Sequence, residues 1–175
     1  MALGRFCLLV VLAGGWLGAS VSSGFSAKDA AVTTSGLPIP RYVSLKSDHV
    51  NVRAGPTKDN DVAWVYTRAG LPVEITAEFE NWRRVRDSEG AEGWVYHSLL
   101  SGRRTAVVTM KSKDGLTPIY DRADQTGTVT ARLQAGVVAQ VKHCAADWCH
   151  ISGNGYDGWI EQQRLWGVYA DEKVD

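Results

Sequence analysis

An internal repeat is the feature that most constrains how this chain folds. Five short motifs recur in the same order: Leu45–Ser47 with Met110–Ser112, Ala69–Gly70 with Ala135–Gly136, Trp82 with Trp148, Gly93–Val95 with Gly158–Ile160, and Leu99 with Leu165. The two members of each pair lie 65 or 66 residues apart. Such a constant spacing indicates two copies of one structural unit. We place the copies at 41–102 and 105–167.

Each copy has the pattern of short β-strands. Apolar and polar residues alternate over Leu71–Ala77 and again over Val137–Val141, which predicts strands buried on one face only. Asn154–Gly155 predicts a hairpin turn with positive φ at both positions. A unit of about 60 residues cannot leave two bare sheet edges, so we expect closure into a small barrel. The predicted fold is therefore all-β, with two small β-barrels in tandem.

The N-terminal residues 1–24 have the pattern of a secretory signal peptide. Arg5 precedes an apolar run, Phe6–Leu12, and small residues follow at Gly18–Ser23. The alternative is an uncleaved N-terminal anchor. Cleavage would leave no stable membrane span and would place the protein in the periplasm or outside the cell. Residues 25–40 are predicted to be a linker, and residues 168–175 an acidic tail.

The charge balance argues against a nucleic-acid partner. The chain of 175 residues has 19 basic and 19 acidic side chains, so its formal net charge is zero. A protein that binds a phosphate backbone presents a basic field, and the chain as a whole has none.

Four segments of the first copy form a distinctive set: Val50–Pro56, Gly70–Val73, Trp82–Val85 and Gly93–Val95. Together they resemble an exported bacterial SH3-like domain. The most specific is the asparagine-valine-arginine-x-glycine-proline element at 51–56. The second copy looks diverged, because Leu116–Asp121 replaces that element. The resemblance implies SH3-like barrels with a non-catalytic role, often in binding cell-wall material or a peptide in the envelope.

We expect no catalytic residues and no cofactor. After signal cleavage the remaining cysteines lie in a single hairpin, and the sequence has no paired acid and base, nucleophile elbow or phosphate loop.

The cysteine hairpin could hold either a disulfide or a zinc ion. His143, Cys144, Cys149 and His150 are all potential zinc ligands. Alternation along a strand sends the two histidines to the face opposite the two cysteines, so four ligands cannot converge. We therefore favour a disulfide between Cys144 and Cys149 with Cα atoms about 5.5 Å apart, and no metal site. Glu78 and Arg83 occupy the equivalent places in the first copy and predict a cross-strand ion pair.

Ligand binding is assigned to an aromatic groove. Strand parity places Trp82 on the outer face with Arg84, and Trp148 likewise in the second copy. The alternative is that Trp82 caps the end of the core. Trp64 and Tyr66 could widen the groove or fill the core, and the arginines could be a solvated face. The candidate groove residues are Arg53, Trp64, Tyr66, Trp82, Arg84 and Trp148.

The sequence thus predicts an exported binding module without catalytic activity. Its expected partner is a cell-wall polymer such as peptidoglycan, or a peptide of an envelope protein. The alternative is a structural or protein-interaction subunit of the periplasm with no wall ligand. The oligomeric state stays open.

Overall fold

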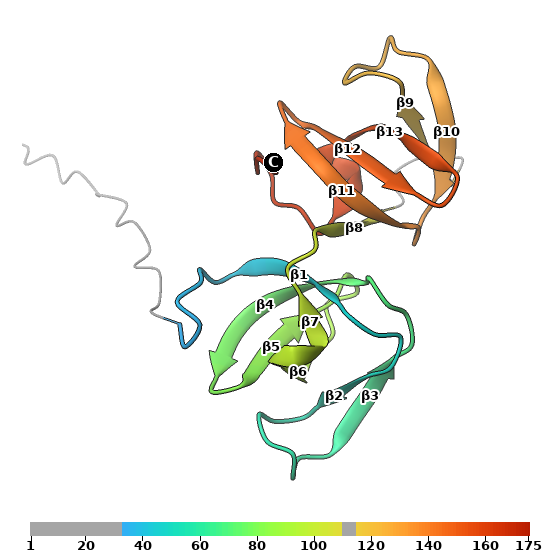
Figure 1. The fold of residues 1–175 in the computed structure, drawn as a ribbon. Helices are drawn as coiled ribbons and strands as arrows, with labels where there is room; N and C mark the ends of the chain where they lie inside the picture. The colour runs from blue at the N-terminus through green and yellow to red at the C-terminus, as the bar shows by residue number, and fades with distance from the viewer. Residues whose placement is uncertain (1–32, 110–114) are drawn as a thin grey trace, which may run out of the picture.

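The computed structural model describes residues 33–109 and 115–175, so the predicted signal peptide lies outside the described residues. Apart from two 3-10 turns, the regular structure in these ranges is all β. The chain folds as two small β units in tandem, as the repeat predicted (Figure 1). We call them barrel 1 (residues 41–101) and barrel 2 (residues 105–166).

The two barrels contain the same elements in the same order. Barrel 1 consists of β1 (Arg41–Leu45), β2 (Val50–Arg53), β3 (Val62–Tyr66), β4 (Pro72–Phe79), β5 (Trp82–Arg86), β6 (Glu92–Tyr96), the 3-10 turn η1 (His97–Leu99) and β7 (Leu100–Ser101). Barrel 2 consists of β8 (Thr105–Val108), β9 (Leu116–Tyr120), β10 (Val129–Gln134), β11 (Val138–Ala145), β12 (Trp148–Gly153), β13 (Tyr156–Glu161), the 3-10 turn η2 (Gln162–Arg164) and β14 (Leu165–Trp166).

Each barrel is one seven-stranded sheet that curls around its own core. The strand order is β3-β2-β6-β5-β4-β1-β7 in barrel 1 and β10-β9-β13-β12-β11-β8-β14 in barrel 2, so the repeat extends to topology. A bulge in β4, between Ile75 and Ala77, recurs in β11 between Val141 and His143. Such bulges bend a strand and allow the sheet to curl.

The backbone pairing corrects two pairs of the sequence repeat. Leu165 begins β14 as Leu100 begins β7, and the two pair with Val108 and Leu45, so Leu165 takes the place of Leu100 and not of Leu99. The Leu45 carbonyl accepts from Gly70 N, and the equivalent bond joins the Val108 carbonyl to Gly136 N. Val108, and not Met110, therefore occupies the place of Leu45. The first strand of barrel 2 therefore lies two residues earlier in the chain, and further from the rest of its unit, than the sequence motifs suggested.

Gly93 and Gly158 occupy equivalent places where two strands approach closely. A Cβ atom at Gly93 would lie 2.4 Å from Val52 Cγ1, and one at Gly158 would lie 2.8 Å from the Tyr120 carbonyl oxygen. Only glycine fits such an approach. This close approach explains the glycine of each glycine-tryptophan pair.

Strand β4 differs from the prediction of a half-buried strand. Its first four residues, Pro72–Ile75, are all buried. Val73 and Ile75 lie in the core of barrel 1, whereas Pro72 and Glu74 face barrel 2, where Pro72 lies against Gly167. Alternation along the strand holds, but the neighbouring barrel covers the face that would otherwise meet solvent.

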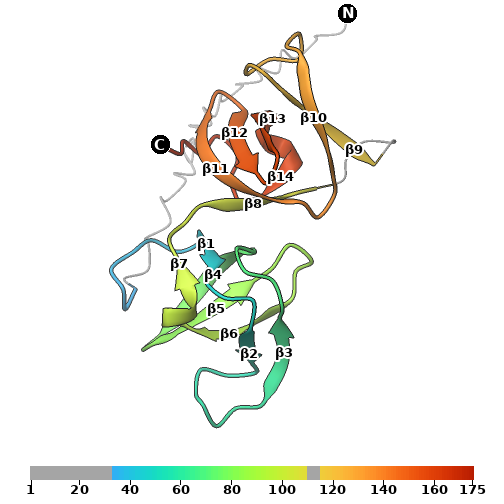
Figure 2. The same ribbon diagram turned by 45° about the vertical axis from the view of Figure 1, so that its right-hand side comes forward.

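The two barrels are joined by an aromatic and polar contact. Figures 1 and 2 show β1 and β4 of barrel 1 next to β8 of barrel 2. The Tyr42 ring lies 5.1 Å from Trp166 and 4.6 Å from Tyr169 between centroids. Burial, with the charge of Glu74, raises the pKa of Tyr42 to about 12, so this phenol stays neutral at physiological pH.

Glu74 is the polar centre of this contact. Its carboxylate is 3% exposed and accepts hydrogen bonds from Tyr169 Oη at 2.9 Å and from Arg86 Nε at 2.9 Å. A buried carboxylate requires such partners. The two barrels therefore share one satisfied polar network across their boundary.

The hairpins β4–β5 and β11–β12 are held at the same place by different chemistry. In barrel 2, Cys144 and Cys149 are paired in register and form the predicted disulfide. In barrel 1, Glu78 accepts from Arg83 Nε at 3.2 Å, which confirms the predicted ion pair, and from Arg41 at 2.6 Å.

The Cα atoms of the two cysteines are 4.1 Å apart, closer than the 5.5 Å that we expected. The reason is that Cys144 exchanges its backbone hydrogen bonds with Val174 and not with Cys149. The cysteines thus form a non-hydrogen-bonded pair, in which opposed residues lie closer together.

The turn at Asn154–Gly155 also differs from the expectation. Of its two residues only Gly155 has positive φ, at 81°. A two-residue turn of this kind needs a left-handed residue only at the second position, which glycine provides.

Candidate binding grooves

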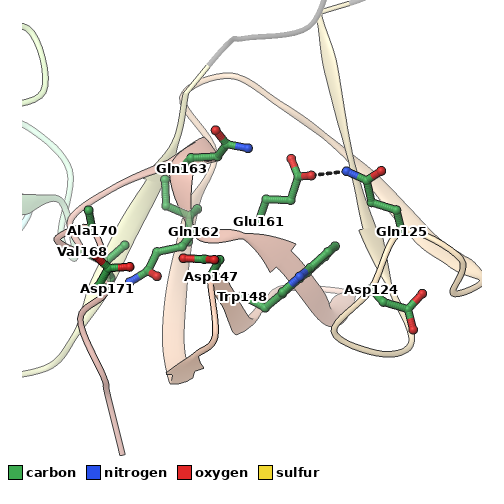
Figure 3. A pocket seen from close by; sticks show the side chains of 11 residues that line it. Asp124, Gln125, Asp147, Trp148, Glu161, Gln162, Gln163, Val168, Ala170 and Asp171 are labelled. Atoms are coloured by element: carbon green, nitrogen blue, oxygen red, sulfur yellow. Dashed lines mark hydrogen bonds between the residues drawn. The ribbon is translucent and has the colours of Figure 1, made fainter.

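A large cavity lies on barrel 2, next to Trp148. Its volume is about 750 Å³ (Figure 3). Four segments enclose it: the β9–β10 loop, the β11–β12 turn, the end of β13 with η2, and the C-terminal residues 168–171. The lining residues are Asp124, Gln125, Asp147, Trp148, Glu161, Gln162, Gln163, Leu165, Val168, Ala170 and Asp171. We call this the barrel 2 groove.

Strand β12 places the Trp148 side chain in the groove. Trp148 is the first residue of β12, and Cys149 after it points into the core. Alternation therefore directs the Trp148 side chain to the opposite face. Trp148 is half-buried, pairs in register with Glu161, and meets the Tyr120 ring edge-on at 5.8 Å. In Figure 3 its indole lies between Glu161 and Asp124.

The C-terminal segment forms a wall of the groove. Val174 is buried and makes an antiparallel bridge to Cys144. Gln162, 5% exposed, donates from Nε2 to the carbonyls of Tyr169 at 2.7 Å and Glu172 at 3.0 Å. The residues predicted to be an acidic tail thus pack against barrel 2, and they contribute Val168, Ala170 and Asp171 to the lining.

Two of the four carboxylates in the groove have partners. Glu161 accepts from Arg164 Nε at 2.5 Å and from Gln125. Burial alone would raise the pKa of Glu161, but these hydrogen bonds lower it below its ordinary value. Asp124 accepts from Thr126 and Arg122, and these contacts lower its pKa. Both groups are therefore ionised at neutral pH.

The other two carboxylates have no side-chain hydrogen bond or ion pair within residues 33–109 and 115–175. These are Asp147, in the β11–β12 turn, and Asp171, in the C-terminal segment, and both are exposed. Among the described lining residues there is no lysine, arginine or histidine. The barrel 2 groove is therefore an acidic cavity with an aromatic floor.

Barrel 1 has a smaller cavity at the equivalent place. Its volume is about 170 Å³. The lining residues are Asn51, Arg53, Lys58, Trp82, Tyr96 and Leu99. Trp82 pairs in register with Tyr96, as Trp148 does with Glu161. The two cavities are therefore copies of one site, and we call this one the barrel 1 groove.

The structure brings together only two of the residues proposed for a groove in barrel 1. Arg53 and Trp82 line the barrel 1 groove, where Arg53 donates to the Asn60 carbonyl at 2.6 Å. Trp82 lies on the outer side of the sheet, yet it is 8% exposed, because Tyr96 contacts its ring edge-on at 5.4 Å. This burial leaves little of the indole for a ligand.

The other proposed residues of barrel 1 lie elsewhere. Trp64 and Tyr66 pack against the core cluster of barrel 1. Tyr66 donates from its hydroxyl to Asp87 at 3.0 Å, and burial with this hydrogen bond raises its pKa well above the ordinary value. Arg84 is exposed on β5 and pairs with Glu92 at 2.6 Å.

The histidines next to the disulfide face away from it, toward Trp159. The His150 ring stacks on Trp159 at 5.0 Å, and His143 meets the same indole edge-on at 6.1 Å. In the described ranges no group of three or more histidine, cysteine or acidic side chains is arranged to hold a metal ion.

Most of the barrel 2 groove could not be predicted from the sequence, which indicated Trp148 but not Asp147, Glu161 or Asp171. The repeat could have suggested Glu161, because it takes the place of Tyr96. Nothing local in the sequence indicates that residues 168–171 return to the same cavity.

The family model described as "Bacterial SH3 domain" matches residues 46–102 and 113–167. The chain is a member of the bacterial SH3 domain family. Both barrels are covered, so the diverged second copy belongs to the family as well as the first. This is a family of binding domains.

Other comparisons add little. No curated protein sequence matches the chain. Among solved structures, NlpC2 of Trichomonas vaginalis is 16% identical with a TM-score of 0.34, covering 78% of this bacterial SH3 protein and 50% of that chain. NlpC1 of the same organism is 18% identical with a TM-score of 0.32, covering 72% and 45%. The protein thus spans about half the length of these structures.

No helix among the described residues is long and apolar enough to cross a membrane.

Proposed function

We propose that this protein is an exported, non-catalytic binding module that holds cell-wall material, namely peptidoglycan or a peptide in the envelope, in the barrel 2 groove. The observation that carries the proposal is the cavity of about 750 Å³ floored by Trp148. A concave site with a half-buried aromatic side chain and several polar groups is typical of ligand recognition. Membership in a family of binding domains supports the same reading.

Barrel 2 is favoured over barrel 1 as the principal site. The barrel 1 groove measures about 170 Å³, and its Trp82 is buried. A cavity of that size accepts at most a small group of a ligand, whereas the barrel 2 groove has the volume of an ordinary small-ligand site.

Co-sedimentation with purified peptidoglycan tests the proposal. The full chain is expected to sediment with the polymer, and Trp148→Ala to lose most of this binding. Trp159→Ala is the matched control, because Trp159 lies on the same barrel but contacts His150 and does not line the groove. Thermal melting of each variant separates lost binding from lost folding.

Two outcomes would contradict the proposal. The first is equal binding by Trp148→Ala and the parent chain. The second is no binding of peptidoglycan or of envelope peptides, together with a stable complex with another protein. The second outcome would favour a structural or interaction subunit.

Export is the part of the proposal that rests on the sequence of residues 1–24. Intact-mass measurement of protein from the envelope fraction is expected to show a chain that starts between residues 20 and 28. A mass that includes Met1–Ala19 would contradict cleavage.

A further inference from the structure

We propose that the barrel 2 groove selects a positively charged peptide group, an ammonium or a guanidinium. This inference rests on the proposed function and names the chemistry of the ligand. It comes from three features of the groove: the charge of its lining, the aromatic face, and the contrast with the equivalent groove of barrel 1.

The lining of the groove is negative. Asp124, Asp147, Glu161 and Asp171 supply four carboxylates, and no basic side chain is among the described lining residues. Arg122 and Arg164, which are not among the lining residues, partly compensate Asp124 and Glu161. Asp147 and Asp171 remain uncompensated in the described ranges, so the groove has a net negative field that a cation would neutralise.

Trp148 provides a surface for the same cation. An ammonium or guanidinium over an indole face is attracted by the ring quadrupole, and tryptophan is the best aromatic partner. The Trp148 indole lines the same cavity as Asp147 and Glu161 (Figure 3). A lysine-type side chain can therefore place its alkyl stem along the indole and its charge among the carboxylates.

The lining of the barrel 1 groove has the opposite charge. It includes Arg53 and Lys58 and has no carboxylate among the described lining residues. Glu161 stands in barrel 2 where Tyr96 stands in barrel 1. The two copies have thus diverged in charge, and an anionic ligand that suits barrel 1 would be repelled by barrel 2.

A divalent metal is a poorer occupant of the groove than an organic cation. A metal ion needs several oxygen ligands that converge on one point. No three acidic groups in the described chain are arranged in that way. The carboxylates instead stand around a cavity large enough for a side chain.

A set of three matched peptides tests the charge preference. We use N-acetylated, C-amidated Ala-Lys-Ala and its Gln and Glu counterparts, and follow binding to the full chain by calorimetry. The lysine peptide is expected to bind about tenfold or more tightly than the glutamine peptide, from an ion pair and a cation–π contact together. The glutamate peptide is expected to bind more weakly still. Equal binding of the three would overturn the inference.

Charge variants assign the effect to the groove. Asp147→Asn combined with Asp171→Asn is expected to weaken binding of the lysine peptide about ninefold to 25-fold, because each exposed charge contributes about threefold to fivefold. Asp157→Asn is the matched control, because Asp157 lies on the same barrel and pairs with Lys142 outside the groove. An unchanged affinity in the double variant would refute the assignment.

Acetylation of free amines on purified peptidoglycan identifies the source of the cation. Lost binding after acetylation assigns it to the cell wall. If peptidoglycan never binds but the lysine peptide does, the inference holds with a protein peptide as the source. If peptidoglycan binds through Trp148 and acetylation has no effect, the proposed function stands and the inference fails.

Discussion

Reduction of the Cys144–Cys149 disulfide should destabilise barrel 2 selectively. The bond closes a loop with a sequence separation of only five residues. The loop-closure relation gives about 2 kcal/mol for so short a loop. Barrel 1 folds with Glu78 and Arg83 at the same places, so the disulfide stabilises the hairpin but is not needed to form it.

Calorimetry with and without a reductant measures the effect. For a unit of about 60 residues, 2 kcal/mol corresponds to a fall of about 8 to 16 °C in the melting temperature. Because the barrels share the Glu74 contact, local probes are also needed. Hydrogen exchange should accelerate at Ile151 in the core of barrel 2 and stay nearly constant at Val85 in the core of barrel 1.

Thiol titration of the denatured, unreduced protein gives the direct control, with no free thiol expected from this pair. Two free thiols from Cys144 and Cys149, or stoichiometric zinc after purification without chelator, would refute the reasoning. So would a melting temperature that does not respond to reduction.

Three further predictions concern the fold. The pKa of Glu78 is lowered to about 2, because hydrogen bonds from neighbouring groups and the charge of Arg83 outweigh a burial effect that alone would raise it. The ionised Glu78 carboxylate therefore adds about 2 to 3 kcal/mol to the free energy of unfolding above pH 4.5, and this contribution is lost as the pH falls toward 2. Urea unfolding at a series of pH values measures it. Tyr169→Phe removes the hydrogen bond to Glu74 and should cost about 2 kcal/mol by the same assay. Gly158→Ala should cost about 1 to 3 kcal/mol, because the new Cβ meets backbone.

Each of these has a control or a contrary result. Glu78→Gln should lose most of the extra acid sensitivity, and equal sensitivity in both proteins would contradict the assignment. Tyr169→Phe with parental stability would show that the barrel contact is not stabilising. Gly102→Ala, where nothing lies within 4 Å of the new Cβ, should be nearly neutral; a loss as large as that of Gly158→Ala would refute the steric argument.

The sequence could predict the features that depend on local pattern or on the repeat. The strands follow from alternation, and the disulfide from the placement of Cys144 and Cys149 on either side of a short turn. The pairing of Glu78 with Arg83 followed from the same register. These are contacts between residues close in sequence, whose geometry is fixed by the hairpin.

The rest depends on contacts between distant segments, which no local pattern encodes. Glu74 looked like a solvent-facing strand residue, but Tyr169 of the C-terminal segment covers it. Trp82 had the parity of a groove residue, but Tyr96 buries it. The barrel 2 groove exists only because residues 168–171 return beside Trp148.

The most direct test of the central claim is a nuclear magnetic resonance titration with soluble peptidoglycan fragments. Each tryptophan gives its own indole N–H signal, so the spectrum reports which aromatic side chain meets the ligand. We expect the Trp148 indole N–H signal to shift, together with the backbone amide signals of 161–163 and 168–171, which surround the groove. Shifts confined to Trp159 and its histidines, or no shift at saturating fragment, would contradict this expectation.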